Sequence, residues 1–297
     1  MATLAASPVS WGIDFADHPD NPPWHVVLDE IASSGLRELE LGPVGYIPTA
    51  TVGQELAERG LRALGTWLVL PLSASRAEID AIDTVLPTIE LIQASGGSHV
   101  ILIDRAGGER GQTAGRPSAA RRLDGRERAR FASNVLRIAE LARGRGLDVT
   151  FHPHTATFVE FEDEVEWLLE QTAADGLRLC LDTAHLTWAS MDPAESLRRY
   201  AEVLGHVHLK DLDRDRVAMA QAQALGFWEA IAAGVFCPIG AGCVSFQEVA
   251  DALRDVGYQG AATIEQDRAP RDAGPALTQL RTSIAHLQAA FGAHLSV

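Results

Sequence analysis

Lysine is almost absent from this chain of 297 residues, in which Lys210 is the only lysine among 25 lysine and arginine side chains. An arginine-rich composition leaves a few lysines by chance, and one of them can fall anywhere. An ammonium differs from a guanidinium, however, because its pKa can fall on burial. Lys210 also follows a His-x-His pair at the predicted end of a strand, which favours a chemical role for it.

Long apolar runs and Cys-x-x-Cys pairs are also missing, and the N-terminal segment does not have the pattern of a secretory signal. No stretch of about 18 apolar residues occurs, which argues against a membrane span. The N-terminal MATLAASPVSWG lacks a basic region followed by a long apolar run, so the sequence predicts no secretory signal. Cys180, Cys237 and Cys243 are odd in number and lack Cys-x-x-Cys spacing, which indicates reduced thiols.

Positive charge is scarce overall. The formal net charge is −15 and the isoelectric point is near 5.0. Because phosphate-rich partners require a basic surface, we expect no nucleic acid and no membrane among the partners. With 46% hydrophobic residues, the chain can bury a large core. This composition favours a soluble, cytoplasmic enzyme that acts on a small molecule.

Short apolar runs alternate with longer amphipathic stretches along the whole chain. Several runs are rich in valine, isoleucine and leucine without strict alternation, as expected for strands covered on both faces. The eight candidate strands are residues 7–11, 36–41, 62–69, 99–104, 148–152, 177–182, 205–209 and 261–265. The clearest helices are residues 24–34, 77–94, 126–143, 159–171, 193–203 and 246–256.

Eight successive β–α units predict an α/β fold, a (β/α)8 TIM barrel that forms one domain over residues 1–297. An open, doubly wound sheet is the alternative, but no Gly-x-Gly-x-x-Gly follows the first predicted strand. Two long connections stand out, at residues 105–126 and 211–241. The first is either a lid over a site or a mobile insertion.

Polar side chains gather at the predicted carboxyl ends of the strands, where βα barrels place their catalytic groups. Five of the ten histidines occur at three successive strand ends, in FHPH (151–154), LDTAH (181–185) and HVHLKD (206–211). Glu40 and Glu265 end two further strands. Each has an ordinary explanation alone: Asp182 as a helix N-cap, His206 as a hydrogen-bonded core residue, and Glu40 or Glu265 as an ion-pair partner. Together they predict a metal site, because burying them without a metal costs several kcal/mol each.

The donor set indicates which metal to expect. Imidazole and carboxylate ligands together suit Mn²⁺, Co²⁺, Fe²⁺ or Zn²⁺ more than Mg²⁺, which prefers oxygen ligands. Of these we expect Mn²⁺ or Co²⁺, with Zn²⁺, Fe²⁺ or Mg²⁺ as alternatives. We therefore expect a divalent metal ion as cofactor.

Seven segments resemble the xylose isomerase-like sugar isomerase/epimerase superfamily of TIM barrels, and more narrowly its inosose dehydratase (2-keto-myo-inositol dehydratase) branch. They are SPVSWGIDFADHPDNPPW (7–24), ELELGPVGYIP (38–48), FHPHTATFVE (151–160), LDTAHLTWA (181–189), HVHLKD (206–211), FWEAIAAGVFCPIGAGCVSF (227–246) and IEQD (264–267). Asp-x-x-His and His-x-Lys occur widely in the superfamily. The first segment, His-Pro-His and Gly-Val-Phe-Cys-Pro-x-Gly-x-Gly are more specific.

The resemblance implies a role for each matching residue. Asp182, His208 and Glu265 become metal ligands. His154, His185 and Lys210 become acid–base groups beside the substrate, with Glu265 as the strong carboxylate, and Trp11 and Glu40 become pocket residues. Many relatives end the fifth strand with Glu-x-His, whereas this chain has His152 at the glutamate position. His152 is therefore the expected fourth ligand, and Glu160 is the alternative.

The resemblance also implies the reaction. Superfamily epimerases are expected to use two carboxylates on opposite sides of the substrate, and His152 breaks that symmetry. This favours a hydro-lyase that removes water from 2-keto-myo-inositol in inositol catabolism, with Lys210 lowered in pKa beside the metal. The alternatives are an isomerase or epimerase, a repair nuclease disfavoured by the charge, and a non-catalytic carbohydrate-binding barrel. A homo-oligomer, dimer or tetramer, is expected.

Overall fold

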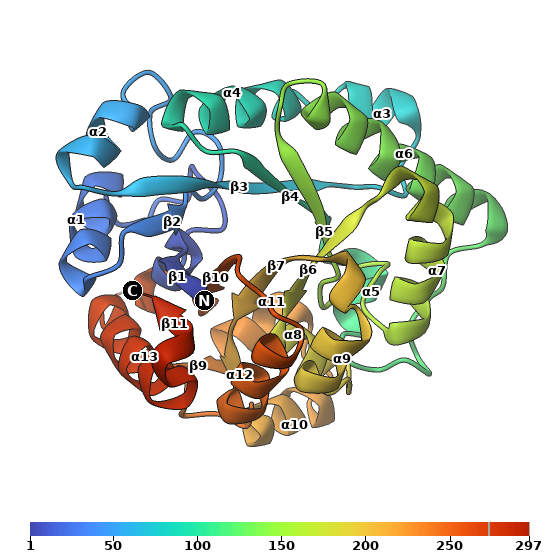
Figure 1. The fold of residues 1–297 in the computed structure, drawn as a ribbon. Coiled ribbons are helices and arrows are strands. Elements are labelled where there is room, and N and C mark those ends of the chain that lie inside the picture. The colour runs from blue at the N-terminus through green and yellow to red at the C-terminus, as the bar shows by residue number, and fades with distance from the viewer. Residues whose placement is uncertain (273, 297) are drawn as a thin grey trace.

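Eight parallel strands close into a barrel in the computed structural model, which describes residues 1–272 and 274–296 (Figure 1). β1 pairs with β2 on one side and with β10 on the other, so the main sheet closes on itself. The predicted (β/α)8 architecture is confirmed. The barrel strands are β1 (Ala2–Ala6), β2 (Glu38–Glu40), β3 (Arg62–Leu70), β4 (His99–Asp104), β5 (Asp148–His152), β6 (Arg178–Asp182), β7 (Leu204–Leu209) and β10 (Ala261–Ile264).

The predicted first strand at residues 7–11 is wrong. Those residues form a 3₁₀ helix, η1 (Pro8–Trp11), and the strand is the alanine-rich segment before it. Pro8 stands at the first turn, where its fixed φ suits a helix start, and Gly12 ends the turn at φ 80°. The strand and the 3₁₀ helix are both largely buried, so an apolar composition alone does not tell which of the two segments is the strand.

Helices surround the strands on the outside of the barrel (Figure 1). The predicted helix at 77–94 is two helices, because Ser75 and Glu78 form a capping box on a short first one that ends at Asp80. The helices are α1 (Trp24–Ser34), α2 (Val52–Glu58), α3 (Arg76–Asp80), α4 (Val85–Ser95), α5 (Gly108–Gln112), α6 (Gly125–Arg143), α7 (Glu162–Thr172), α8 (Thr183–Trp188), α9 (Pro193–Arg199), α10 (Arg214–Ala222), α11 (Phe227–Ala232), α12 (Phe246–Asp255) and α13 (Ala276–Phe291).

The connection after β4 is anchored rather than free. It contains α5, whose Arg110 is only 1% exposed. Arg110 donates hydrogen bonds to both oxygens of Glu164 and to Glu160 Oε2. An arginine between two buried carboxylates holds this segment against the residues that follow β5, because separating the ions would leave unpaired buried charge.

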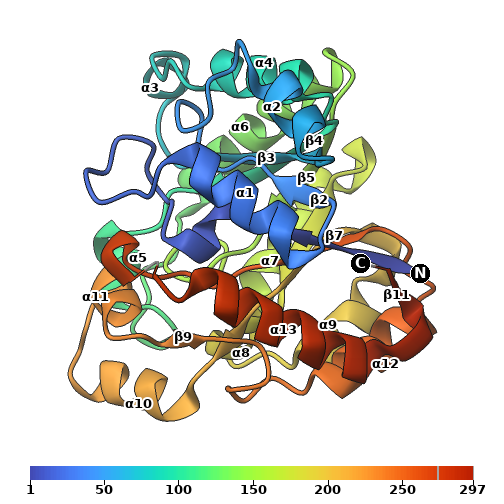
Figure 2. The same cartoon turned by 90° about the vertical axis from the view of Figure 1, so that its left-hand side faces the viewer.

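The connection after β7 carries a second small sheet, in which β8 (Asp211–Leu212) pairs antiparallel with β9 (Phe236–Cys237). Asp211 holds this region together by accepting hydrogen bonds from the amides of Gly240, Gly242 and Val244. α5, α10 and α11 lie on the side away from the termini, whereas the two termini lie close together because β11 (Leu295–Ser296) pairs with β1 (Figure 2).

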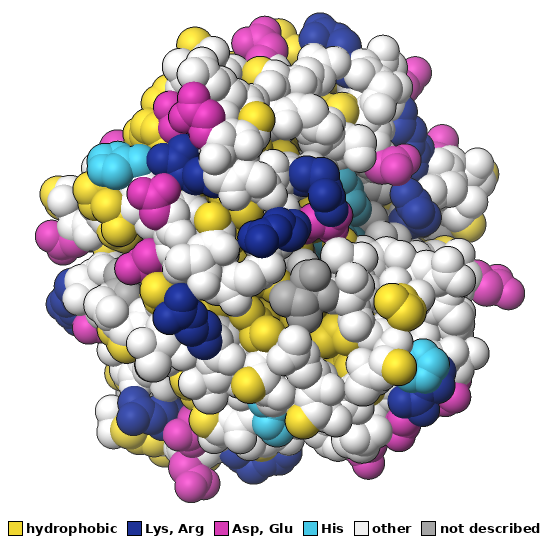
Figure 3. All heavy atoms as spheres, turned by 60° about the vertical axis from the view of Figure 1, so that its left-hand side comes forward, with side chains coloured by type: hydrophobic (Ala, Val, Ile, Leu, Met, Phe, Trp, Pro, Cys, Tyr) yellow, Lys and Arg dark blue, Asp and Glu magenta, His cyan; other side chains and the backbone are white. Residues whose placement is uncertain are grey.

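Charges of both signs are interspersed on the surface seen in Figure 3, where the dark blue side chains stand among acidic ones. Since Lys210 is buried, the exposed basic side chains are arginines. Within the described residues, no helix combines the length and apolar character needed to cross a membrane. The three cysteines are unpaired, with Cys180 buried, as the sequence predicts.

Gly65 is a point where the barrel admits no side chain. A Cβ there would lie 1.8 Å from the carbonyl oxygen of His99 on the neighbouring strand. We expect Gly65→Ala to lower the free energy of unfolding by at least about 3 kcal/mol, because backbone must move in both strands. Urea unfolding measures this. Gly125→Ala is the control, since nothing lies within 4 Å of that position, and equal midpoints for the two variants would contradict the argument.

Candidate metal centre and active site

Five acidic or imidazole side chains from five strands meet at one end of the barrel. Glu40, His152, Asp182 and His208 lie in β2, β5, β6 and β7, and Glu265 directly follows β10. Each is at most 5% exposed. Neighbouring parallel strands bring these positions together, as the pairing of Asp182 with His208 illustrates. This placement at the carboxyl ends of the strands is the one expected of a βα barrel.

The two carboxylate oxygens of Asp182 have different surroundings. Oδ1 accepts hydrogen bonds from the amides of Ala184 and His185, so it caps the N-terminus of α8. Oδ2 is buried and makes no hydrogen bond. The N-cap interpretation and the ligand interpretation of Asp182 therefore both apply, because the cap fixes the side chain and aims its second oxygen into the site.

Three buried polar atoms make no hydrogen bond, namely Nδ1 of His152, Oδ2 of Asp182 and Nδ1 of His208. The last two have only ionic neighbours, since Lys210 Nζ lies 3.3 Å from Asp182 Oδ2 and Glu265 Oε2 lies 3.3 Å from His208 Nδ1. Ligand atoms of His152, Asp182 and His208 lie within 4.8 Å of one another. Glu265 adds a second carboxylate. Buried polar atoms are normally satisfied, so this group fits a divalent cation. Its two imidazoles and two carboxylates suit Mn²⁺, Co²⁺, Fe²⁺ or Zn²⁺.

Glu40 fixes the orientation of the His208 ring through a hydrogen bond. His208 Nε2 donates to Glu40 Oε1 at 3.1 Å, which leaves Nδ1 free to face the other ligands. A carboxylate behind a ligating imidazole is the usual support for such a ligand. Burial lowers the pKa of His208, but the Cys180 sulfur, Glu265 and Glu40 outweigh it and raise this pKa well above its ordinary value. A bound cation would take the place of that proton.

Lys210 is 1% exposed and touches three carboxylates. Its Nζ lies 2.8 Å from Asp267 Oδ1, 2.9 Å from Glu265 Oε2 and 3.3 Å from Asp182 Oδ2. Burial lowers its pKa, but the carboxylates of Asp182, Asp267 and Glu265 outweigh it and raise the pKa well above the ordinary value. The three carboxylates, which the sequence did not show, thus keep the ammonium charged when no cation is bound, and the lowering expected beside a divalent cation stays a prediction.

His154 and His185 stack beside Lys210, with ring centroids 3.8 Å apart. His154 lines the cavity, whereas His185 lies behind it and accepts a hydrogen bond from Lys210 Nζ at 3.2 Å. Burial lowers the pKa of His154 to about 3 and that of His185 well below its usual range. Both rings are therefore neutral. Of the two predicted substrate contacts, the structure places only His154 on the cavity wall.

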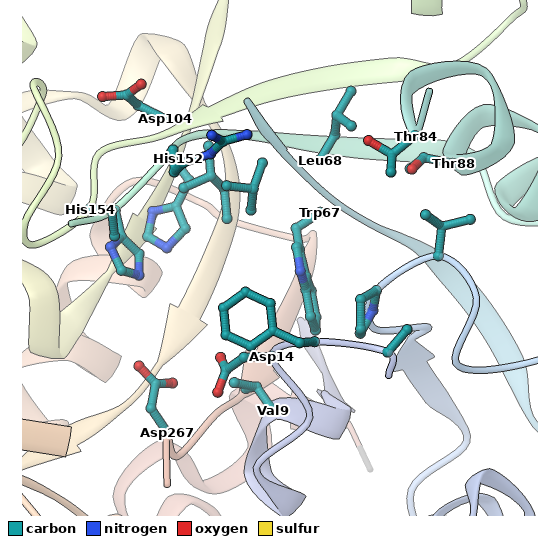
Figure 4. Close-up of a pocket in the computed structure, with 18 of the residues that line it drawn as sticks. Val9, Asp14, Trp67, Leu68, Thr84, Thr88, Asp104, His152, His154 and Asp267 are labelled. Atoms are coloured by element: carbon teal, nitrogen blue, oxygen red, sulfur yellow. The ribbon is translucent and has the colours of Figure 1, made fainter. Parts of the chain in front are cut away.

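A cavity of about 610 Å³ is lined by His152, His208 and Glu265 but not by Asp182, and Figure 4 shows His152 at its wall. Its polar wall includes Asp14 and Asp267, which sequence analysis did not assign to the site and which lie close together in Figure 4. Burial and then Asp267 raise the pKa of Asp14 to about 8. Asp267 follows Glu265 at the two-residue spacing that separates Lys210 from His208, a signal that identifies it in retrospect. Asp14 carries no such signal, because a loop places it.

Two predicted pocket residues lie elsewhere. Trp11 is 1% exposed in the hydrophobic core, and its Nε1 donates to Glu30 Oε2 at 2.5 Å. Because η1 turns its ring inward, Val9 and Asp14 line the cavity instead. Glu40 is fully buried and accepts hydrogen bonds from His206 and His208 rather than lining the cavity. His206 keeps the core role expected of it.

Glu160 does not complete the ligand group. Its Oε1 accepts from the amide of Gly115, and its Oε2 accepts from Arg110 and from the amide of Ala156. Both oxygens are thus occupied. Burial outweighs these hydrogen bonds and raises the pKa of Glu160 to about 7. The structure brings His152, not Glu160, to Asp182 and His208.

Solved structures with the same fold act on or bind different things. An L-ribulose 3-epimerase superposes with a TM-score of 0.72 at 18% identity, over 98% of this chain and 95% of the other. A probable 3-DHS dehydratase, AsbF, from Bacillus anthracis gives 0.71 at 17% identity, over 97% and 99%. The IOLI protein, determined with a bound zinc atom, gives 0.70 at 13% identity, over 97% and 99%. These likenesses show the fold.

Curated relatives align over nearly the whole chain. The rhizopine catabolism protein MocC of Rhizobium meliloti is 29% identical over 99% of this chain and 90% of its own length. An inosose dehydratase of Geobacillus kaustophilus is 26% identical over 92% of this chain and 89% of its own length. The sequence model of one family matches residues 28–290. The chain therefore belongs to the xylose isomerase-like TIM barrel family.

Proposed function

We propose that this protein is a metal-dependent dehydratase that removes water from 2-keto-myo-inositol (scyllo-inosose) to give a trihydroxycyclohexane-dione. The observation that carries the proposal is the gathering of His152, Asp182 and His208, which are buried with ligand atoms within 4.8 Å of one another, beside Lys210 at a cavity. Relatives named inosose dehydratase, 23–26% identical over 92% of the chain, support the substrate.

The proposed ligands are His152, Asp182, His208 and Glu265. A divalent cation held there supplies Lewis acidity to the ketone and its neighbouring hydroxyl. Lys210, cationic among its carboxylates, lies beside the same oxygens and stabilises the negative charge that develops when the α-proton leaves. Its role is electrostatic rather than that of a general base.

Two cavity carboxylates are placed for the proton transfers. Asp267, ionised in its contact with Lys210, accepts the proton from the carbon next to the ketone. The carbon–oxygen bond at the following position then breaks, and its electron pair leaves with the hydroxyl. Asp14, whose pKa of about 8 keeps it protonated at neutral pH, donates the proton that converts the leaving group to water. The enol that remains tautomerises to the dione.

The assay that tests this function follows the product from scyllo-inosose with Mn²⁺ or Co²⁺ in deuterated water. We expect an α-diketone and loss of one water. Deuterium entering the α-carbon of recovered substrate without loss of water would instead identify an isomerase or epimerase. No turnover and no exchange with either metal would refute both proposals.

His152 and Glu160 should differ in their effect on metal binding. We expect His152→Ala to weaken Mn²⁺ binding, measured by calorimetry, by more than about tenfold. Loss of a residue that only supports a metal ligand already weakens binding by about that factor. Glu160→Gln is the matched control. It removes a buried charge close to the site and should leave the affinity near wild type. Circular dichroism checks that both variants are folded, and the reverse order of affinities would make Glu160 the ligand.

Lys210→Arg should abolish turnover while metal content stays near wild type. The guanidinium keeps the charge but cannot fit the position of an ammonium enclosed by three carboxylates. We expect kcat to fall at least about a hundredfold, with metal content measured by mass spectrometry. Lys210→Met removes the charge but keeps an unbranched side chain of similar length, so it tests the effect of the charge alone. Full activity of Lys210→Arg would show that only the charge matters.

The rate should fall as the pH rises through about 8. Asp14 donates only when protonated, and its pKa is raised to about 8, so the acid form is present below that pH and lost above it. Asp14→Asn should lower kcat about a hundredfold and remove this limb of the pH profile. Asp17→Asn, a neighbouring exposed carboxylate, is the control. An unchanged alkaline limb in Asp14→Asn would assign the acid to another group.

A further inference from the structure

The cavity is larger than a bare ring polyol needs. Its volume is about 610 Å³, within the range of roughly 300–1,000 Å³ that holds drug-sized ligands. The proposed ligands His152, His208 and Glu265 lie in its wall together with His154, Asp14 and Asp267. These polar groups gather in one part of the cavity. The rest of the wall is largely apolar and is not needed to bind a bare ring polyol.

An apolar arm extends from this polar part. The apolar residues Val44, Trp67, Val69 and Ile82 line it together with Thr84 and Thr88. Figure 4 shows His152, His154, Asp14 and Asp267 on one side of Trp67 and Thr84 and Thr88 on the other. The indole thus stands between the reacting part and the arm, where it can contact both.

The opening of the cavity exposes aromatic side chains to solvent. Phe15 is 56% exposed and Trp228 is 43% exposed, and their ring centroids are 5.7 Å apart. Val69 is 38% exposed at the same cavity. Large exposed hydrophobic side chains that gather at one opening mark a binding site.

Charged groups do not convert the arm into a site for more hydroxyls. Asp104 accepts hydrogen bonds from the amides of Leu72 and Phe158, one on each oxygen, so it is already satisfied. Asp17 and Arg105 are exposed to solvent. Thr84 and Thr88 bring hydroxyl groups to the arm, so a polyol there would recover only part of its contacts with water, whereas an apolar group would gain from burial.

We propose that the substrate is a cyclic keto-polyol carrying an apolar alkyl or aryl ether substituent, which occupies the arm while the ketone and its neighbouring hydroxyl lie at the metal-binding residues. This rests on the proposed function and narrows its substrate class. The substituent takes no part in the reaction. It positions the ring, because Trp67 contacts it next to the acid–base groups.

The test compares scyllo-inosose with its mono-O-benzyl ether. We expect kcat/KM to be at least about tenfold higher for the ether, since a single well-packed apolar increment gives discrimination of that order. Trp67→Ala should lower this preference about tenfold. Met219→Ala is the control, because Met219 is an exposed hydrophobic residue on α10 outside the cavity, and its preference should match wild type.

A binding measurement separates this inference from the proposed reaction. Calorimetry with scyllo-inositol and its O-benzyl ether, which have no ketone and cannot eliminate, reports the arm alone. Tighter binding of the ether, lost in Trp67→Ala, supports the arm even if no ketone is turned over, in which case only the proposed reaction fails. Equal affinity of the two inositols, or a tenfold kinetic preference for unsubstituted scyllo-inosose, would overturn the inference.

Discussion

The site depends on one constraint, which is that buried carboxylates outnumber the positive charges beside them. Asp182, Glu265 and Asp267 are buried around one ammonium, that of Lys210. Such a group is unstable unless further positive charge balances it, because ionised carboxylates are costly to bury. The Cys180 sulfur, Glu265 and Glu40 likewise raise the pKa of His208 against the effect of burial, so this imidazole tends to hold a proton beside the carboxylates. A divalent cation answers the same need and leaves the imidazole free to act as a ligand.

The barrel was predictable from sequence because its strands are defined by composition and order. Runs at 99–104 and 148–152 coincide with β4 and β5, and a parallel, closed arrangement follows from eight repeated units. The first strand was not predictable in this way. Ala2–Ala6 has the weak strand propensity of alanine, while the richer apolar run that follows it forms η1.

The proposed ligands were predictable for a related reason. Asp182 and His208 lie at strand ends, and parallel register places such positions side by side. The site residues that lie in loops were not predictable from the sequence. The position of Asp14 depends on the turn after η1, and the distances from Lys210 to its carboxylates depend on three strands at once. The apolar arm likewise joins residues from separate connections, so no local pattern announces it.

The connection after β4 shows how a long loop can be rigid. Its glycine and arginine content is typical of a mobile insertion, yet Arg110 is among the most buried side chains of the protein. The pairing of Arg110 with Glu160 and Glu164 also removes Glu160 from competition for a metal. One buried arginine, paired with two carboxylates, thus anchors this connection and keeps Glu160 out of the site.

Asp182 ends a strand, begins a helix and faces the site with the same side chain. A glutamate would keep the charge, but its longer side chain could not reach the first amides of α8 and the site together. An asparagine would keep the cap and present a neutral atom to the site. The position therefore accepts only aspartate if both requirements hold. In this barrel, one aspartate both begins α8 and offers a proposed ligand atom, so an exchange for asparagine would leave the helix start intact and remove only the charge from the site.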